Sequence, residues 1–82
     1  MERAMHPTYQ ILQDGIADTR EAARGKDIFY RCTRCDGIIP SNPNHNTGCA
    51  CGNLFIDRDY FRLSVAQKSA IRILRRLSAP KP

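Results

Sequence analysis

The chain has 82 residues, with 13 Lys and Arg against 8 Asp and Glu, and a formal net charge of +5. This length predicts one small domain, which buries a modest share of its surface and often depends on disulfides or a metal for stability. No apolar run is long enough to cross a bilayer and the first residues do not resemble a secretory signal, so we expect a soluble cytoplasmic protein without a membrane partner.

Residues 8–17, the first part of an N-terminal hairpin and helix region predicted over residues 8–25, carry two competing signals. Apolar residues at helical spacing favour one long helix, whereas Asp14-Gly15 is a strong hairpin-turn signal and glycine is unfavourable inside a helix. We favour the hairpin, with residues 9–13 paired to residues 16–17, and keep the helix as the alternative.

A short helix is predicted directly after this hairpin. Asp18 can accept a hydrogen bond from the amide three residues later, and Glu21 can reach back, which together form a capping box. Gly25 suits the left-handed position that ends such a helix. The stretch Ile28-Phe29-Tyr30-Arg31 then predicts a strand that leads into Cys32.

The four cysteines come as two close pairs separated by thirteen residues. Cys32 and Cys35 form a Cys-x2-Cys pair, whereas Cys49 and Cys51 form a tighter Cys-x-Cys pair that is followed by a glycine. A tetrahedral zinc site needs four soft ligands that converge on one point, and two short cysteine pairs on two turns supply them. We therefore predict a four-cysteine zinc ribbon over residues 28–65 that binds one structural Zn²⁺ ion.

Three other uses of the cysteines compete with zinc. Two disulfides would suit a secreted domain, iron would also accept four thiolates, and a redox dithiol would need a thiol of lowered pKa. His45, in the polar loop 41–48, is a further candidate ligand, but four cysteines already complete a structural zinc shell. A closed shell leaves no position for an activated water, so we expect a protein that is not an enzyme and has no small-molecule substrate.

The C-terminal half is expected to contain strands and then a helix. Residues 38–39 predict a short strand before the loop, and residues 54–57 and 60–63 predict two strands joined at Arg58-Asp59. Ser64-x-x-Gln67 is a second capping box, which predicts a helix over residues 65–78. On a helical projection, its apolar arc contains Ala66, Ala70, Ile73, Leu74 and Leu77. The opposite, basic arc contains Lys68, Arg72, Arg75 and Arg76.

The basic arc is the best candidate for a partner-binding surface. No Asp or Glu occurs from Tyr60 to the C-terminus, so the predicted helix offers no acidic neighbour to neutralise it. An unneutralised row of Lys and Arg can follow phosphates, and Arg31, Tyr60 and Arg62 could add an aromatic-basic patch that stacks bases. An ordinary solvated helix face and packing of the aromatic residues in the core are the alternatives. Four thiolates and one zinc ion carry a net charge of −2, so the metal-bound chain would keep only +3.

Residues 30–65 resemble small, mostly uncharacterised zinc-ribbon proteins of phages and bacterial mobile elements. The matching residues are Cys32, Cys35, Ser41, Cys49, Cys51, Gly52, Asp57, Tyr60 and Arg62. The resemblance implies a ribbon fold with four cysteine ligands and no particular activity. Similar ribbons occur near bacterial toxin loci, where an immunity role is suspected.

The expected fold is a small metal-stabilised α+β domain that occupies residues 1–82. It would be a β-rich four-cysteine zinc ribbon with a short N-terminal helix and a C-terminal amphipathic helix. The expected function is non-enzymatic binding of nucleic acid, DNA or RNA, through the basic helix. The alternative is a protein-binding inhibitor, immunity or adaptor protein of a phage or mobile element, because a ribbon scaffold specifies no partner.

Overall fold

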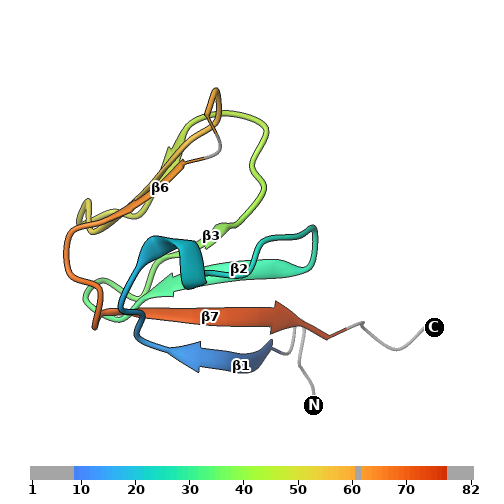
Figure 1. Cartoon of the computed structure of the whole chain (residues 1–82), viewed down its shortest axis with the longest axis vertical. Helices are drawn as coiled ribbons and strands as arrows, with labels where there is room; N and C mark the ends of the chain where they lie inside the picture. The colour runs from blue at the N-terminus through green and yellow to red at the C-terminus, as the bar shows by residue number, and fades with distance from the viewer. Residues whose placement is uncertain (1–8, 61, 78–82) are drawn as a thin grey trace, which may run out of the picture.

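The computed structural model describes residues 9–60 and 62–77, which form two antiparallel sheets. The three-stranded sheet rises at an angle from one end of the four-stranded sheet (Figure 1). A four-stranded sheet has the order β1-β7-β2-β3, and a three-stranded sheet has the order β4-β5-β6. The elements are β1 (Tyr9–Asp14), the 3-10 turn η1 (Thr19–Glu21), β2 (Ile28–Cys32), β3 (Ile38–Pro40), β4 (Thr47–Gly48), β5 (Leu54–Asp57), β6 (Arg62–Val65) and β7 (Ile71–Arg76). No helix in this described part is long and apolar enough to span a membrane.

The predicted C-terminal helix is wrong, because its second half forms strand β7 in the middle of the four-stranded sheet. Ile71 and Ile73 are β-branched and alternate with Arg72, which suits a strand with one buried face. Both isoleucines are buried, whereas Arg72 is only partly covered. Hydrogen-bonded ladders to β1 on one side and β2 on the other replace the bonds that a helix would make within itself.

The predicted N-terminal hairpin is also wrong, although its turn signal is correct. Gly15 has a φ of +82°, and the chain turns there at the end of β1. However, β1 pairs with β7 rather than with residues 16–17, in a register that runs from Tyr9 opposite Arg76 to Asp14 opposite Arg72. The partner of β1 therefore comes from the far end of the sequence.

The capping-box helix predicted after this turn is reduced to the 3-10 turn η1. The Asp18 carboxylate accepts a hydrogen bond from the amide of Arg20 at 2.8 Å, two residues on, and also binds the Arg20 guanidinium. These bonds to Arg20, the side-chain bond first, lower the pKa of Asp18. Ala22 then adopts an extended conformation that ends the turn. The described chain is therefore all-β, and the predicted α+β class is wrong.

The strand predictions next to the cysteines are confirmed. Residues 28–31 lie in β2, residues 38–39 in β3 and residues 54–57 in β5. The last predicted strand, 60–63, is displaced to β6, and Phe61 lies outside the described residues. The core that joins the elements contains Ile16, Tyr30, Cys32, Ile39, Leu54, Ile56, Val65, Ile71 and Ile73.

Candidate metal centre and basic surfaces

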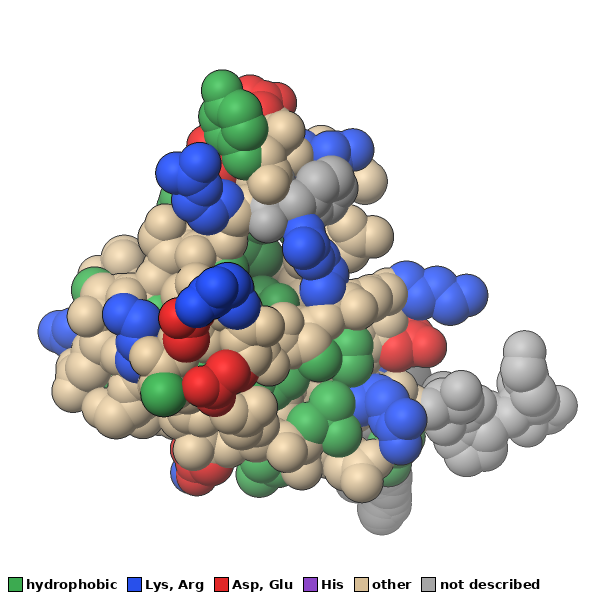
Figure 2. Space-filling view, in the orientation of Figure 1, with side chains coloured by type: hydrophobic (Ala, Val, Ile, Leu, Met, Phe, Trp, Pro, Cys, Tyr) green, Lys and Arg blue, Asp and Glu red, His purple; other side chains and the backbone are tan. Residues whose placement is uncertain are grey.

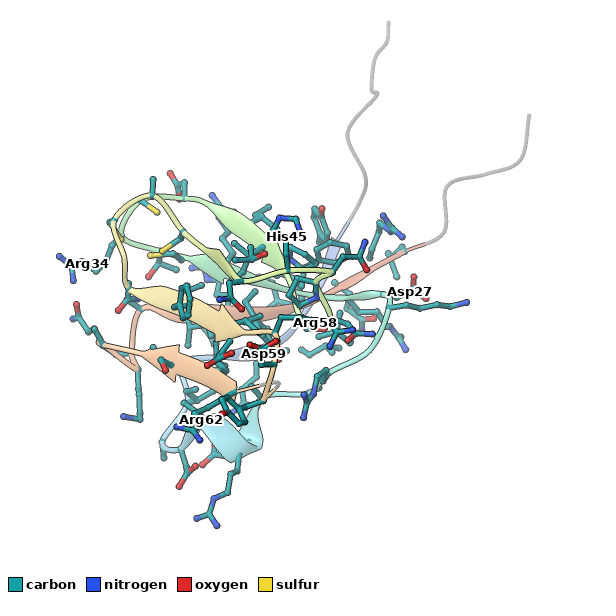
Figure 3. All side chains as sticks on the ribbon, turned by 90° about the horizontal axis from the view of Figure 1, so that it is seen from above. Asp27, Arg34, His45, Arg58, Asp59 and Arg62 are labelled. Carbon is teal, nitrogen blue, oxygen red and sulfur yellow. The ribbon has the colours of Figure 1, made fainter. Side chains whose placement is uncertain are left out.

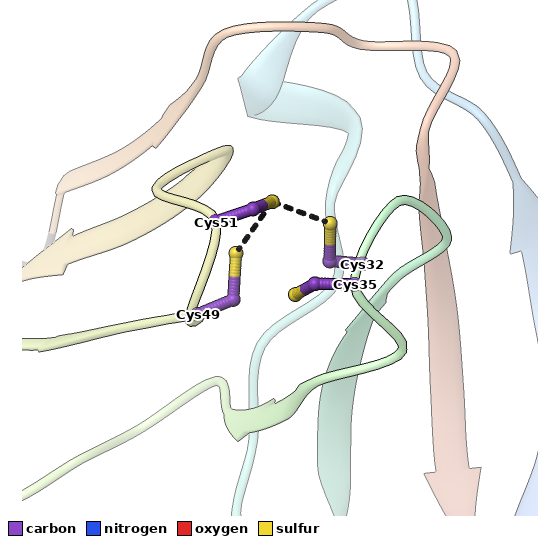
Figure 4. Close-up of side chains that lie close together, drawn as sticks. All are labelled: Cys32, Cys35, Cys49 and Cys51. Carbon is purple, nitrogen blue, oxygen red and sulfur yellow. Dashed lines mark hydrogen bonds between the residues drawn. The ribbon is translucent and has the colours of Figure 1, made fainter.

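The four cysteines that the sequence singles out lie together at one end of the two sheets (Figure 4). Their Sγ atoms all lie within 4.8 Å of one another, and Cys51 Sγ is 3.5 Å from Cys32 Sγ and 3.8 Å from Cys49 Sγ. None of the four forms a disulfide. A tetrahedral zinc ion with Zn–S bonds of about 2.3 Å would hold its sulfurs about 3.8 Å apart. The cluster therefore has the size and the donor set to hold a metal ion.

The first cysteine pair is shaped by a tight turn at the end of β2. The amide of Cys32 donates to the carbonyl of Gly37, and the amide of Asp36 donates to the carbonyl of Cys32, both at 2.8 Å. Asp36 adopts a positive φ of 62°, a conformation that Asp tolerates better than most residues. A Cβ atom at Gly37 would stand 3.3 Å from Cys35 Sγ, so the missing side chain leaves room for the sulfur.

The second pair is placed by the turn that enters β5. Gly52 has a φ of +81°, and its amide donates to the carbonyl of Cys49 at 3.0 Å. The amide of Leu54 lies 3.3 Å from Cys49 Sγ, and the amide of Arg34 lies 3.4 Å from Cys32 Sγ. Amide donors of this kind stabilise thiolates, which are the form that binds metals.

The protonation of the thiols depends on these amides and on the crowding of the sulfurs. Backbone hydrogen bonds from Cys51 and then from Gly37 lower the pKa of Cys35 to about 6. For Cys51, the amide of Asn53 lowers the pKa, but burial and the three neighbouring sulfurs outweigh it and raise the value to about 11. The crowding of the sulfurs therefore opposes the ionisation of Cys51, whereas a bound dication would compensate the charge of the thiolates.

Asn53 is a supporting residue that the sequence reading missed. It is only 2% exposed, and its Nδ2 donates to the carbonyl of Ala70 at 3.2 Å and lies 3.7 Å from Cys32 Sγ. Its Oδ1 accepts from the amide of Gln67 at 2.7 Å. One side chain thus connects the cysteine cluster to the turn between β6 and β7. No spacing rule distinguishes this asparagine from the surface asparagines of the loop 41–48.

The predicted basic residues do not form one surface. Arg31 and Arg72 lie directly opposite each other on β2 and β7. Tyr60 and Arg62 lie apart from them at the tip and start of β6, with the Arg62 guanidinium carbon 5.5 Å from the centre of the Tyr60 ring. Lys68 is exposed in the turn before β7.

The expectation that the basic arc lacks acidic partners is wrong for Arg72 and Arg76. Side chains from other strands and turns reach them, because the tertiary fold brings together residues far apart in sequence. The pairs are Arg72 with Asp14 at 3.4 Å, Arg31 with Asp36 at 2.9 Å, Arg76 with Asp27 at 3.6 Å, and Arg75 with the amide oxygen of Gln10 at 2.9 Å. His45 is exposed and lies outside the cysteine cluster (Figure 3).

No family model, no curated protein and no solved structure matches this chain. The resemblance to zinc-ribbon proteins of phages and mobile elements therefore stays a prediction that rests on the motif residues of the sequence.

Proposed function

We propose that this chain is a non-enzymatic binding module that is held together by one structural zinc ion and binds single-stranded nucleic acid. The proposed interface is the outer face of the four-stranded sheet, which points away from the three-stranded sheet. The observation that carries this proposal is the position of Arg31 directly opposite Arg72 on neighbouring strands of that face.

Zinc is the metal that best fits the site, with Cys32, Cys35, Cys49 and Cys51 as ligands. Two short cysteine pairs on tight turns, with sulfurs at near-tetrahedral spacing, are typical of closed structural zinc sites. In a chain of this size a metal supplies stability that a small core cannot provide. Iron accepts the same four thiolates, so elemental analysis of the purified protein is the direct test.

The register of the strands divides the outer face into three rows. The alternation of side chains places Cys32 and Tyr30 on the inner, buried face, and their neighbours on the outer face. Across the sheet, the rows are Asp14, Arg72, Arg31 and Ile38; then Ile11, Leu74, Phe29 and Pro40; then Tyr9 and Arg76. The face thus combines an apolar middle row with arginines on both sides.

Arg31 and Arg72 stand side by side on this face, and within the described residues each is paired with only one exposed carboxylate. Like charges directly opposite each other on neighbouring strands destabilise a sheet. The Nε atoms of Arg31 and Arg72 are buried and make no hydrogen bond to the described part of the chain, although Arg72 Nε is 3.4 Å from Asp14. A phosphate over the pair would relieve the repulsion and accept hydrogen bonds from both guanidinium groups.

Aromatic residues beside the pair suit unpaired bases. The rings of Tyr9 and Phe29 meet edge to face with their centres 5.7 Å apart, and the Arg76 guanidinium carbon lies 5.2 Å from the centre of the Phe29 ring. Bases of any sequence can stack on such rings while arginines hold the phosphates. The existing pairs with Asp14 and Asp36 involve exposed carboxylates, and exposed ion pairs contribute only about 0–1 kcal/mol, so a phosphate can compete with them.

The test is a fluorescence-anisotropy titration of labelled single-stranded DNA, single-stranded RNA and duplex DNA at several salt concentrations. The double variant Arg31→Gln, Arg72→Gln should bind single strands about tenfold more weakly, with a log–log salt slope lower by about one to two units. The control Arg34→Gln, Lys68→Gln removes the same charge from exposed sites outside the rows, and should retain most of the affinity. An equal loss in both double variants would show that the face is not the binding site.

Binding of a protein is a second candidate, favoured by exposed apolar residues on the same face. Ile11 is 54% exposed and Ile38 is 41% exposed, at opposite edges of the sheet. Co-purification from lysate treated with nuclease tests this alternative. A protein-binding function would be favoured if a partner remains bound after nuclease treatment. That partner should be lost in the double variant Ile11→Ser, Ile38→Ser and kept in the double variant Arg31→Gln, Arg72→Gln.

A further inference from the structure

A cleft of about 350 Å³ lies on the inner side of the four-stranded sheet, between η1, β2 and the β5-β6 hairpin. This volume is at the lower end of the range for small-molecule sites, and is enough for one small ligand. Its apolar lining comes from Ala22, Ile56 and Leu63. Figure 2 shows basic side chains gathered around the hollow between the three-stranded sheet and the body of the molecule.

The cleft is lined by arginines, and the hydroxyl groups of Tyr30 and Ser41 at its floor already form hydrogen bonds. Three arginines line it, Arg20, Arg24 and Arg62, and no carboxylate is among the lining residues. The Tyr30 hydroxyl donates to the carbonyl of Ala23 at 2.7 Å, and the Ser41 hydroxyl donates to the carbonyl of Gly25 at 2.8 Å. The floor hydroxyls are thus engaged with the backbone, so recognition of a charged ligand falls to the arginines.

One wall of the cleft offers a flat ring. Tyr60 is 72% exposed, and the Arg62 guanidinium lies against its ring. On the other wall, Arg20 is held in place by two bonds to the Asp18 carboxylate, at 3.1 and 3.2 Å. These bonds use the Nε atom and one terminal nitrogen of Arg20, so its other terminal nitrogen is the donor that faces a ligand. An exposed aromatic ring next to arginines combines a stacking surface for a base with guanidinium donors for a phosphate.

We propose that this cleft binds one nucleoside monophosphate unit, with its base against Tyr60 and its phosphate between Arg20 and Arg62. The unit is either a free nucleotide or the 5′-phosphorylated end of a strand, and both present the same chemistry. The inference goes beyond the proposed function, because the cleft and the rows of arginines lie on opposite faces of the four-stranded sheet. The two sites can therefore be tested separately.

The experiment is isothermal titration calorimetry of the full-length purified protein with adenosine 5′-monophosphate, adenosine and inorganic phosphate. We expect adenosine 5′-monophosphate to bind at least about tenfold more tightly than either fragment, because only it engages both walls. Arg62→Gln and Tyr60→Ala should each weaken this binding about tenfold, whereas Tyr60→Phe should preserve it. The control is Arg34→Gln, at the first cysteine turn away from Arg62 (Figure 3), which should bind like the wild type.

A second titration identifies the source of the nucleotide. A trinucleotide with a 5′-phosphate that binds more tightly than the free nucleotide, and than the same trinucleotide with a 5′-hydroxyl, assigns the cleft to strand ends. A free nucleotide that binds more tightly than both trinucleotides assigns it to mononucleotides. Each result supports the inference and selects one source.

Three results would overturn the inference. The first is that adenosine 5′-monophosphate shows no saturable binding below about 1 mM. The second is that inorganic phosphate binds as tightly as adenosine 5′-monophosphate. The third is that Arg62→Gln and Arg34→Gln lose the same amount of affinity for the nucleotide. The Arg31→Gln, Arg72→Gln protein should keep its affinity for the mononucleotide. Loss of mononucleotide binding in that protein, with none in Arg62→Gln, would place the nucleotide on the outer face and refute the cleft while sparing the proposed function.

Discussion

Replacement of Asn53 by alanine tests whether the cysteine cluster and the central strand β7 are held together by one buried side chain. Asn53→Ala removes the acceptor of the Gln67 amide and one donor to the Ala70 carbonyl. The Ala70 carbonyl keeps a bond from the amide of Thr33 at 3.1 Å, so most of the cost falls on the Gln67 amide. A lost bond together with a partly buried unsatisfied donor gives an expected destabilisation of about 2–3 kcal/mol.

The assay is urea unfolding at a fixed free zinc concentration, followed by circular dichroism. Asn44→Ala is the matched control, because Asn44 is exposed in the loop before β4 and its replacement should change the free energy of unfolding by less than about 0.5 kcal/mol. An Asn53→Ala protein as stable as this control would refute the coupling between the cluster and β7.

The variant Asn53→Asp tests the acceptor atom of the Asn53 side chain separately from its donor atom. Its carboxylate keeps an acceptor for the Gln67 amide, but it replaces a donor 3.7 Å from Cys32 Sγ with a negative charge. We expect a loss of stability at least as large as in Asn53→Ala, because the buried carboxylate would face the Ala70 carbonyl and the Cys32 sulfur without a donor. Zinc affinity should fall about tenfold in a chelator competition, in line with other changes around metal ligands. Unchanged zinc affinity would show that the amide does not influence the cluster.

Three further predictions concern the metal and the core. Elemental analysis should find one zinc per chain. Chelation or Cys49→Ser should unfold the protein as judged by circular dichroism, because metal binding and folding are coupled in such sites. A folded metal-free protein would contradict this prediction. Ile73→Ala should lower the free energy of unfolding in urea by about 2–4 kcal/mol, since Ile73 is buried in the core. Gly48→Ala should cost about 1–3 kcal/mol in the same assay, because its Cβ would stand 2.9 Å from the Leu54 carbonyl oxygen, and an unchanged midpoint would show that the strands can separate without cost.

The sequence by itself determined the parts of this protein whose structure depends on nearby residues. The spacing of the two cysteine pairs predicted the cluster, because two close cysteines on a tight turn can present both sulfurs to the same point. The stretches 28–31 and 54–57, rich in branched and aromatic residues, predicted β2 and β5. The turn at Gly15 was likewise predicted from a local signal, since it needs only a positive φ.

Only the tertiary structure decided the state of residues 71–76. Their apolar residues fit one face of a helix and also fit a strand, and the preceding Ser64-x-x-Gln67 favoured the helix. The strand prevails because β1 and β2, which come from much earlier in the chain, supply hydrogen bonds on both of its edges. No local window of sequence contains those partners, so the energy that selects the strand is absent from a local reading.

Contacts between distant segments also explain the ion pairs of β7 and the burial of the Asn53 side chain. Asp14 and Asp27 neutralise arginines of β7 that have no acidic neighbour in their own segment. Asn53 is buried because the turn before β7 folds over it and supplies partners for both ends of its amide. Pairing and burial of these polar groups depend on contacts between distant segments, and such contacts exist only once the sheets have assembled.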